Sequence, residues 1–191
     1  MKEMNRREFL TLTGAAVVAL SLAGCGGGSY APPAPAAPTG KEAELLAAIN
    51  KVWKEKFAAK EVDHEQLILN QEAQGAIKIQ GGIFEDAQTP VRTLTDEDKM
   101  KLTEIQKWQI SMNKKYDLGG AAGISEPTGE DENMEISLTF EYSCENAAVQ
   151  KFVDKIMAYS LSRKAEFISI YCPVVQSTTY MIATVFWNKT A

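Results

Sequence analysis

The chain has 191 residues and a formal net charge of −5, from 20 Lys and Arg against 25 Asp and Glu. Without residues 1–40, which we assign below to an export segment and a linker, 17 basic and 23 acidic residues remain, a net charge of −6. Nucleic-acid binding depends on basic side chains that neutralise phosphates, so an acidic domain without a basic run is a poor candidate for it. The remaining 151 residues suffice for one domain with its own core.

Residues 1–24 have the layout of an export signal. Arg6 and Arg7 lie in a charged start, and the run Thr11–Ala23 is almost purely apolar or small. About 13 residues are too few to cross a hydrocarbon core, which takes roughly 20 in a helix. A charged start, a short apolar run and a small-residue end are typical of a removable secretory signal. The adjacent arginines resemble a twin-arginine signal, which is a receptor-read address.

The signal ends in Leu-Ala-Gly-Cys25, which resembles a bacterial lipobox. That resemblance implies that Cys25 receives the lipid and becomes the first residue of the mature chain. The alternative is an ordinary core helix with an incidental cysteine. Residues 25–40 then form a linker, in which Gly26–Gly28 is flexible and Ala31–Gly40 is rich in Pro and Ala. We expect it to remain unfolded, because it has few large apolar groups to bury.

These features predict a bacterial lipoprotein anchored through lipid on the extracytoplasmic side of the membrane, in the cell envelope. The acidic domain gains nothing electrostatically from an anionic membrane surface, so the lipid on Cys25 must provide the anchoring.

Two helices are predicted at the start of the domain, which spans residues 41–191. In the first, from Lys41 to about Lys60, apolar residues recur at spacings of three and four. The second starts near Asp63, which with Gln66 resembles a capping box, and we expect Gly81-Gly82 to end it.

The segment Thr95–Asp98, a cap followed by acids in the first turn, predicts the start of a third helix. This helix should end before Gly119-Gly120. The segment Ser125–Asn133 is an acidic, turn-rich loop. After it the period changes to two, since apolar and polar residues alternate over Ile136–Tyr142 as in a strand with one buried face.

The domain closes with one more helix and two strands. Ser143 should cap the helix, whose apolar stripe extends to Ser160, and strands are expected near Glu166–Cys172 and Thr179–Trp187. The last strand is apolar on both faces, as in a central strand covered on both sides. The order helix, helix, helix, strand, helix, strand, strand predicts an α+β fold, an α-β-α sandwich with a small, mostly antiparallel sheet.

The sequence contains no recognisable catalytic residue. His64, the only histidine, is more simply a surface neighbour of a helix cap than a general base. There is no nucleophile elbow, no H-E-x-x-H and no phosphate-binding glycine loop. Trp53, Trp108 and Trp187 fall on apolar faces, where core packing is the default and a ligand groove the alternative.

Metal and disulfide sites are also weakly supported. Cys144 and Cys172 remain after export and could pair in an oxidising compartment, or stay as buried free thiols. With one histidine they lack the spacing of a zinc site. Glu130–Glu132 lacks the alternating ligands of a calcium loop and indicates a solvated acidic loop. We therefore expect no cofactor.

Four segments carry a resemblance to the CAP superfamily, the cysteine-rich secretory protein, antigen 5 and pathogenesis-related 1 proteins, also called SCP domains. Glu44–Asn50 is similar to the opening helix of that family, and Tyr180–Phe186 to its closing strand. Ala148–Phe152 and Ser160–Arg163 stand where the family has Ala-Val-x-x-Trp and then Ser-x-x-His. The resemblance implies an α-β-α sandwich.

The family's site of two histidines and two glutamates, often tied to metal binding, is not kept. Arg163 stands in place of one histidine and Lys155 in place of a glutamate, and the second histidine has no counterpart near Ala73–Ile77. Glu145-Asn146 matches the Gly-Glu-Asn motif only loosely. Arg and Lys cannot replace imidazole and carboxylate as metal ligands, so the resemblance implies a degenerate site without metal.

We therefore expect a non-catalytic domain that binds a ligand or partner. Arg163, Lys155 and Ser160 could line a groove for an anionic or glycan ligand. One alternative is an envelope hydrolase or wall-modifying factor that uses paired carboxylates, since glycoside hydrolysis needs no histidine. Another is an accessory subunit of an exported complex, which the twin arginines suggest.

Overall fold

A computed structural model describes residues 40–129 and 133–189, without the side chains of residues 108–112. The predicted export signal, the lipobox with Cys25 and the linker up to Thr39 lie outside the described residues, as does Glu130–Glu132. All residues of the described core lie between Leu45 and Trp187. The core that the structure describes is therefore built from the segment that starts at Gly40.

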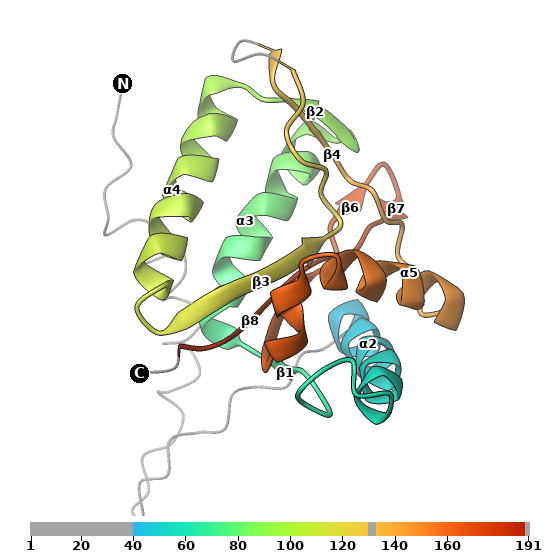
Figure 1. Ribbon diagram of the computed structural model, residues 1–191. Coiled ribbons are helices and arrows are strands. Elements are labelled where there is room, and N and C mark those ends of the chain that lie inside the picture. Colours follow the sequence, from blue (N-terminus) through green and yellow to red (C-terminus); the bar gives the residue numbers. More distant parts are fainter. Residues whose placement is uncertain (1–39, 130–132, 190–191) are drawn as a thin grey trace, which may run out of the picture. The chain divides into compact units, whose positions relative to one another are not determined.

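The described elements alternate between helices and short strands (Figure 1). In chain order they are α2 (Lys41–Ala58), β1 (Ile68–Leu69), α3 (Gln71–Ala87), β2 (Val91–Thr93), α4 (Asp96–Met112), β3 (Tyr116–Ala122), β4 (Glu135–Ser137), α5 (Asn146–Met157), the 3-10 helix η2 (Ser160–Lys164), β5 (Phe167–Tyr171), β6 (Val174–Val175), β7 (Thr178–Thr179) and β8 (Ile182–Asn188).

The main sheet has four strands in the order β1-β5-β8-β3. Only the β1–β5 pair is parallel, and the β5–β8 and β3–β8 pairs are antiparallel. Two further antiparallel pairs, β2–β4 and β6–β7, flank the sheet. The small, mostly antiparallel sheet is as predicted.

Helices cover both faces of this sheet, α2 and α5 on one side and α3 with α4 on the other (Figure 1). On the first side, Trp53 of α2 and Phe152 of α5 pack in one core cluster with Ile168 of β5. On the second side, Ile77 and Phe84 of α3 pack in another cluster with Ile182 of β8. The predicted α-β-α sandwich is therefore confirmed, and the domain is an α+β fold.

The strand β8 is buried on both of its faces. Ala183 and Val185 point into the cluster of α2 and α5, whereas Ile182 points into the cluster of α3. Phe186 joins a third cluster, in which the ring of Tyr116 stands edge-on to it at 5.5 Å. The prediction of a central strand covered on both sides is confirmed.

The start of the second helix was predicted wrongly. α3 begins at Gln71, and its cap is Asn70, whose side-chain oxygen accepts a hydrogen bond from the Ala73 N–H at 3.1 Å. Asp63 lies in the preceding turn and its carboxylate instead accepts from the Arg163 guanidinium at 2.9 Å. The predicted capping pattern therefore does not form: Asp63 takes part in a long-range ion pair, and Asn70 caps the helix.

The expected end of that helix at Gly81-Gly82 was also wrong. α3 continues through both glycines to Ala87, and Gln88 ends it in the left-handed conformation. Gly81 faces the ring of Tyr171, where an added Cβ would lie 2.4 Å from Cδ1. The Tyr171 hydroxyl donates to Glu85 of the same helix at 2.8 Å, so the ring is fixed across the glycine. Gly81 serves close packing here.

The third helix begins as predicted. Asp98 Oδ2 accepts from the Thr95 N–H at 2.9 Å, and Thr95 Oγ1 accepts from the Asp98 N–H at 3.2 Å. Burial of Asp98 opposes ionisation, but the hydrogen bonds from Thr95 and the Arg92 guanidinium outweigh it and lower the pKa of this carboxyl. The paired bonds fix the first turn of α4.

The strand β3 was not predicted, because Gly119-Gly120 indicated a break. The register of the β3–β8 pair shifts between Leu118 and Ala121, so the two glycines form a bulge inside the strand. An added Cβ on Gly120 would lie 1.9 Å from the Ile156 carbonyl oxygen. The Gly120 N–H donates to Ser162 Oγ at 2.7 Å, which ties the bulge to η2.

The other boundaries differ by less. β4 ends at Ser137, and only isolated bridges continue along the predicted strand to Tyr142. α5 begins at Asn146, and Ser143 does not cap it, because its hydroxyl accepts from the Glu145 N–H at 3.1 Å ahead of the helix. The two closing strands are confirmed, with slightly shifted ends.

The glycine pair gives a stability prediction. We expect Gly81→Ala to lower the free energy of unfolding by about 1–3 kcal/mol, because the new Cβ collides with the Tyr171 ring. We expect Gly82→Ala to raise it by roughly 0.5–1 kcal/mol, since nothing lies within 4 Å of its Cβ position and alanine favours the helix. Urea unfolding of both variants measures the difference, and equal shifts would contradict the packing role.

Candidate functional site

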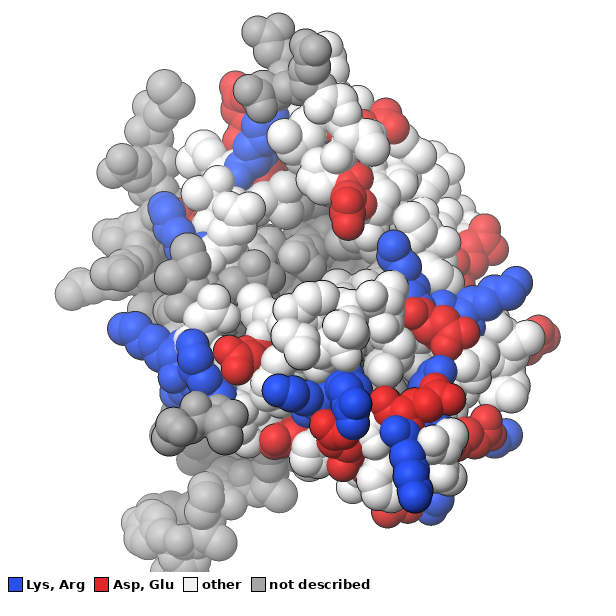
Figure 2. Space-filling model, viewed as in Figure 1, with Lys and Arg blue, Asp and Glu red and all other residues white. Residues whose placement is uncertain are grey.

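A cleft of about 350 Å³ opens between α4 and the edge of the sheet. Its walls come from both helices of one layer, from β3 and β8, and from the loop after β3. The lining residues are Ile77, Gln80, Leu102, Ile105, Gln106, Leu118, Gly119, Ala121, Ala122, Ile124, Ser125, Pro127, Ile136, Ile182, Ala183 and Thr184. Figure 2 views the domain from the side on which α4 and β3 lie.

The cleft exists because α4 packs mainly against α3 and only slightly against the sheet. Its first turn is held by Arg92, whose guanidinium lies 2.8 Å from the Asp98 carboxylate. Further along, the Lys101 ammonium lies 3.1 Å from Asp86 at the end of α3. On the side of β3, the cleft is lined mainly by the small residues Gly119, Ala121 and Ala122.

The bulge forms the floor of this space. Val185 and Trp187 of β8 come within 2.9 and 3.2 Å of where a Cβ of Gly119 would stand. Ala121 and Ala122 follow directly. Bulges redirect the side chains beside them and are common next to binding sites. Here the bulge leaves two alanines at the cleft, with Thr184 of β8 opposite Ala121.

None of the lining residues that the structure describes is charged. The polar groups are two glutamines, a serine and a threonine. Ser125 Oγ is already engaged, since it accepts from the Ser137 N–H at 2.9 Å. The side-chain amides of Gln80 and Gln106 form no hydrogen bond with a described residue, so each can both donate and accept.

These features limit what the cleft can do chemically. Small-molecule sites in proteins measure roughly 300–1,000 Å³ and are mostly apolar with a few orienting polar groups. The described lining has no Asp, Glu, His, Cys or Lys, so it offers no general base to activate the hydroxyls of its serine and threonine. Its composition suits the binding of an uncharged, largely apolar molecule.

The three residues predicted to line a groove lie elsewhere. Arg163 is exposed and paired with Asp63, Lys155 is exposed in the last turn of α5, and Ser160 is exposed at the start of η2. None of them lines this cleft. The structure brings Arg163 and Asp63 together across 100 positions, which the sequence did not suggest.

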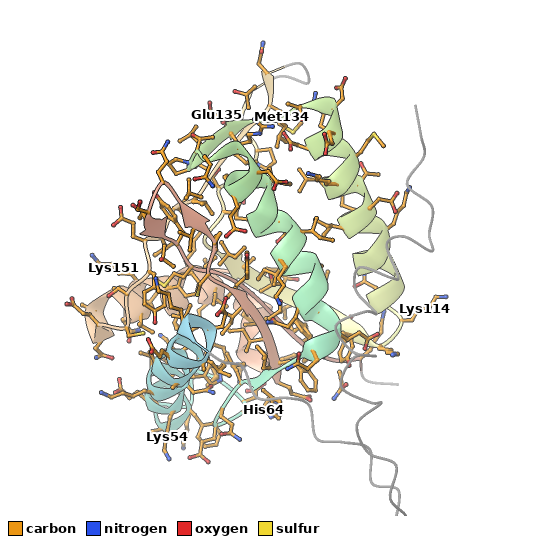
Figure 3. The ribbon with its side chains drawn as sticks, turned by 180° about the vertical axis from the view of Figure 1, so that it is seen from behind. Lys54, His64, Lys114, Met134, Glu135 and Lys151 are labelled. Carbon is orange, nitrogen blue, oxygen red and sulfur yellow. The ribbon has the colours of Figure 1, made fainter. Side chains whose placement is uncertain are left out.

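The lone histidine lies at the surface. His64 Nε2 is 3.8 Å from a Glu166 carboxylate oxygen, and its carbonyl oxygen accepts from the Trp53 indole N–H at 3.0 Å. Figure 3 shows His64 near α2, well apart from α4. Trp53 is buried in the core, as the default interpretation predicted, whereas the side chain of Trp108 lies outside the description.

The two cysteines of the domain are free thiols. Cys144 is exposed and donates to the Tyr142 hydroxyl at 3.3 Å. Cys172 is buried, and burial together with the nearby Glu42 carboxylate raises its pKa to about 12. Because the thiolate is the nucleophile, the burial of Cys172 and its raised pKa both disfavour a reactive role for this thiol. A bridge between the two stays a prediction.

Residues 40–129 and 133–189 contain no group of three or more His, Cys, Asp or Glu that could hold a metal ion. Within the same ranges, no helix has the length and apolar character needed to span a membrane.

The cleft was not found by sequence reasoning. Ile77 and Ile105 were recognised only as members of apolar helix stripes, which is the pattern of any core. The strand that supplies the floor was taken for a break. The nearest signal was the small-residue run Gly119–Gly123, which points to close backbone packing more readily than to a binding site.

Comparison with known proteins gives no relative from which function could be transferred: no family model, curated protein or solved structure matches this chain.

Proposed function

We propose that this chain is a membrane-tethered lipoprotein of the cell envelope, whose domain binds a small, uncharged, largely apolar ligand and does not transform it. The observation that carries the binding function is the cleft of about 350 Å³ between α4 and β3, in whose described lining no side chain is charged. The tether rests on the sequence of residues 1–40.

Apolar contact would supply most of the affinity. Each Å² of apolar surface that a ligand buries contributes roughly 25 cal/mol before the losses of association are subtracted. Gln80 and Gln106 stand on neighbouring helices and can orient a hydroxyl, carbonyl or amide of the ligand. A charged ligand would lose its hydration in the cleft without gaining a partner there.

The CAP resemblance is part of this proposal. The three-layer arrangement agrees with the sandwich that it implies, but the residues at the family's site have changed character. Arg163 is occupied by Asp63, and Lys155 is exposed on α5. A binding role through another surface of the domain, the uncharged cleft, is consistent with this loss.

The hydrolase alternative gains no support from the cleft. Glycoside hydrolysis needs two carboxylates facing one another across the bond. The lining that the structure describes contains none, and the one buried acid among the described residues, Asp98, is engaged with Thr95 and Arg92. We therefore favour binding.

The tether has a direct test. Expressed in a bacterium with lipoprotein processing, the full chain should incorporate radiolabelled palmitate and fractionate with membranes. Cys25→Ser should abolish both, because the thiol is the attachment point. Cys144→Ser is the matched control and should change neither. Palmitate incorporation that persists in Cys25→Ser would contradict the predicted lipidation site.

The cleft has its own test, with the neutral probe N-phenyl-1-naphthylamine. We expect the segment Gly40–Ala191 to enhance its fluorescence, and Ala121→Phe to weaken binding about tenfold, because the new ring occupies the cleft. Ala147→Phe adds the same ring at an exposed position at the start of α5 and should leave binding unchanged.

Thermal unfolding of each variant separates lost binding from lost folding, and Ala121→Leu offers a smaller obstruction should the phenylalanine variant unfold. Probe binding that is equal in Ala121→Phe and Ala147→Phe would place the apolar site elsewhere and refute the proposed function of the cleft.

A further inference from the structure

A second, polar groove of about 430 Å³ lies between η2, the start of β3 and the end of β8. Six of its lining residues carry polar groups: Asn113, Asp117, Tyr159, Lys164, Trp187 and Lys189. Figure 2 shows basic side chains interspersed with acidic ones over the lower part of the face it views. The groove differs from the cleft in charge and shares only Leu118 with it.

Trp187 supplies the most specific feature of this groove. The side chain is only 7% exposed, yet no described residue accepts a hydrogen bond from its indole N–H. Among the described residues, every buried side-chain nitrogen or oxygen atom has a partner, so this N–H is not sealed in the core. It must reach the small open part of the side chain, which lines the groove. A hydrogen-bond acceptor in the groove would satisfy it.

Lys164 supplies an available positive charge. It is exposed on η2 and makes no ion pair or side-chain hydrogen bond with a described residue. Lys189 is already engaged, because its ammonium donates to the Asn113 carbonyl oxygen at 3.0 Å and lies 3.8 Å from Asp117. An anionic group of a ligand would therefore be attracted first to Lys164.

The remaining polar groups of the groove favour a ligand that also carries hydrogen-bond donors. The Asp117 carboxylate can only accept, and it would repel a ligand that carried nothing but negative charge. Tyr159 leaves 47% of its surface exposed, so a ring face is available for the apolar side of a ligand. A molecule that combines an acid with several hydroxyl groups and a weakly polar face meets all of these groups.

We propose that this groove binds an acidic saccharide, with the carboxylate of a uronic acid or similar sugar at Lys164 and the Trp187 N–H. Hydroxyl groups of the sugar would donate to Asp117, and one sugar face would lie on Tyr159. This inference does not depend on the ligand of the cleft.

Calorimetry on the segment Gly40–Ala191 tests the proposal with two tetrasaccharides. A hyaluronan tetrasaccharide carries glucuronate, whereas chitotetraose has a related backbone without acid. We expect binding of the first, weakened by salt, and at least about tenfold weaker binding of the second, because a charge-assisted hydrogen bond is worth roughly 1.5–3 kcal/mol.

Two variants locate the site. Lys164→Gln should lower the affinity for the hyaluronan tetrasaccharide about tenfold, and Trp187→Phe, which keeps a ring but removes the N–H, about fivefold. Lys155→Gln removes an exposed charge outside the groove and should change nothing. Unfolding curves confirm that each variant is folded, and Tyr159→Ala, at an exposed position, replaces Trp187→Phe should the latter unfold.

Three results would overturn the proposal: no binding of the acidic tetrasaccharide, equal affinity for the neutral one, or an equal loss in Lys155→Gln and Lys164→Gln, which would indicate diffuse attraction only. None of them affects the cleft, whose binding of the neutral probe is measured separately. Failure of the apolar site would in turn leave the saccharide result intact.

Discussion

The whole domain depends on burying β8 on both faces. Ala183 and Val185 face the layer of α2 and α5, and Ile182 and Phe186 face the opposite side. A strand with two apolar faces is stable only if helices cover both, which explains why the chain places one helical pair on each side of a four-stranded sheet. β8 pairs with β5 and β3 and packs against α3 and α5, so it lies at the centre of the domain.

The cleft forms because the two helical layers pack against the sheet to different extents. α2 and α5 bury large side chains directly against the sheet, with Trp53, Phe152 and Ile156 fully covered. α4 rests on α3, and the glycine bulge of β3 offers it only small residues. Apolar surface around Ile105 and Ile182 therefore lines a space that a ligand can fill.

Much of the fold could be predicted because its signals are local. The stripes of α2 and α5, the Thr95–Asp98 cap and the two-faced closing strand all act within one element. The wrong predictions concern segments whose structure is determined by contacts with residues far away in the sequence. Gly81 is helical because Tyr171 packs on it, and Gly119-Gly120 lie in a strand because β8 and η2 hold them. The cleft combines several such contacts, so no local pattern marks it.

Isoleucine methyl NMR gives the most direct test of the central claim, that the cleft takes an uncharged apolar ligand. Titrating N-phenyl-1-naphthylamine into methyl-labelled Gly40–Ala191 should shift Ile77, Ile105 and Ile182, which line the cleft. Ile49 and Ile168, in the cluster of the opposite layer, should not move. Shifts confined to Ile49 and Ile168, or no shifts at all, would contradict the account.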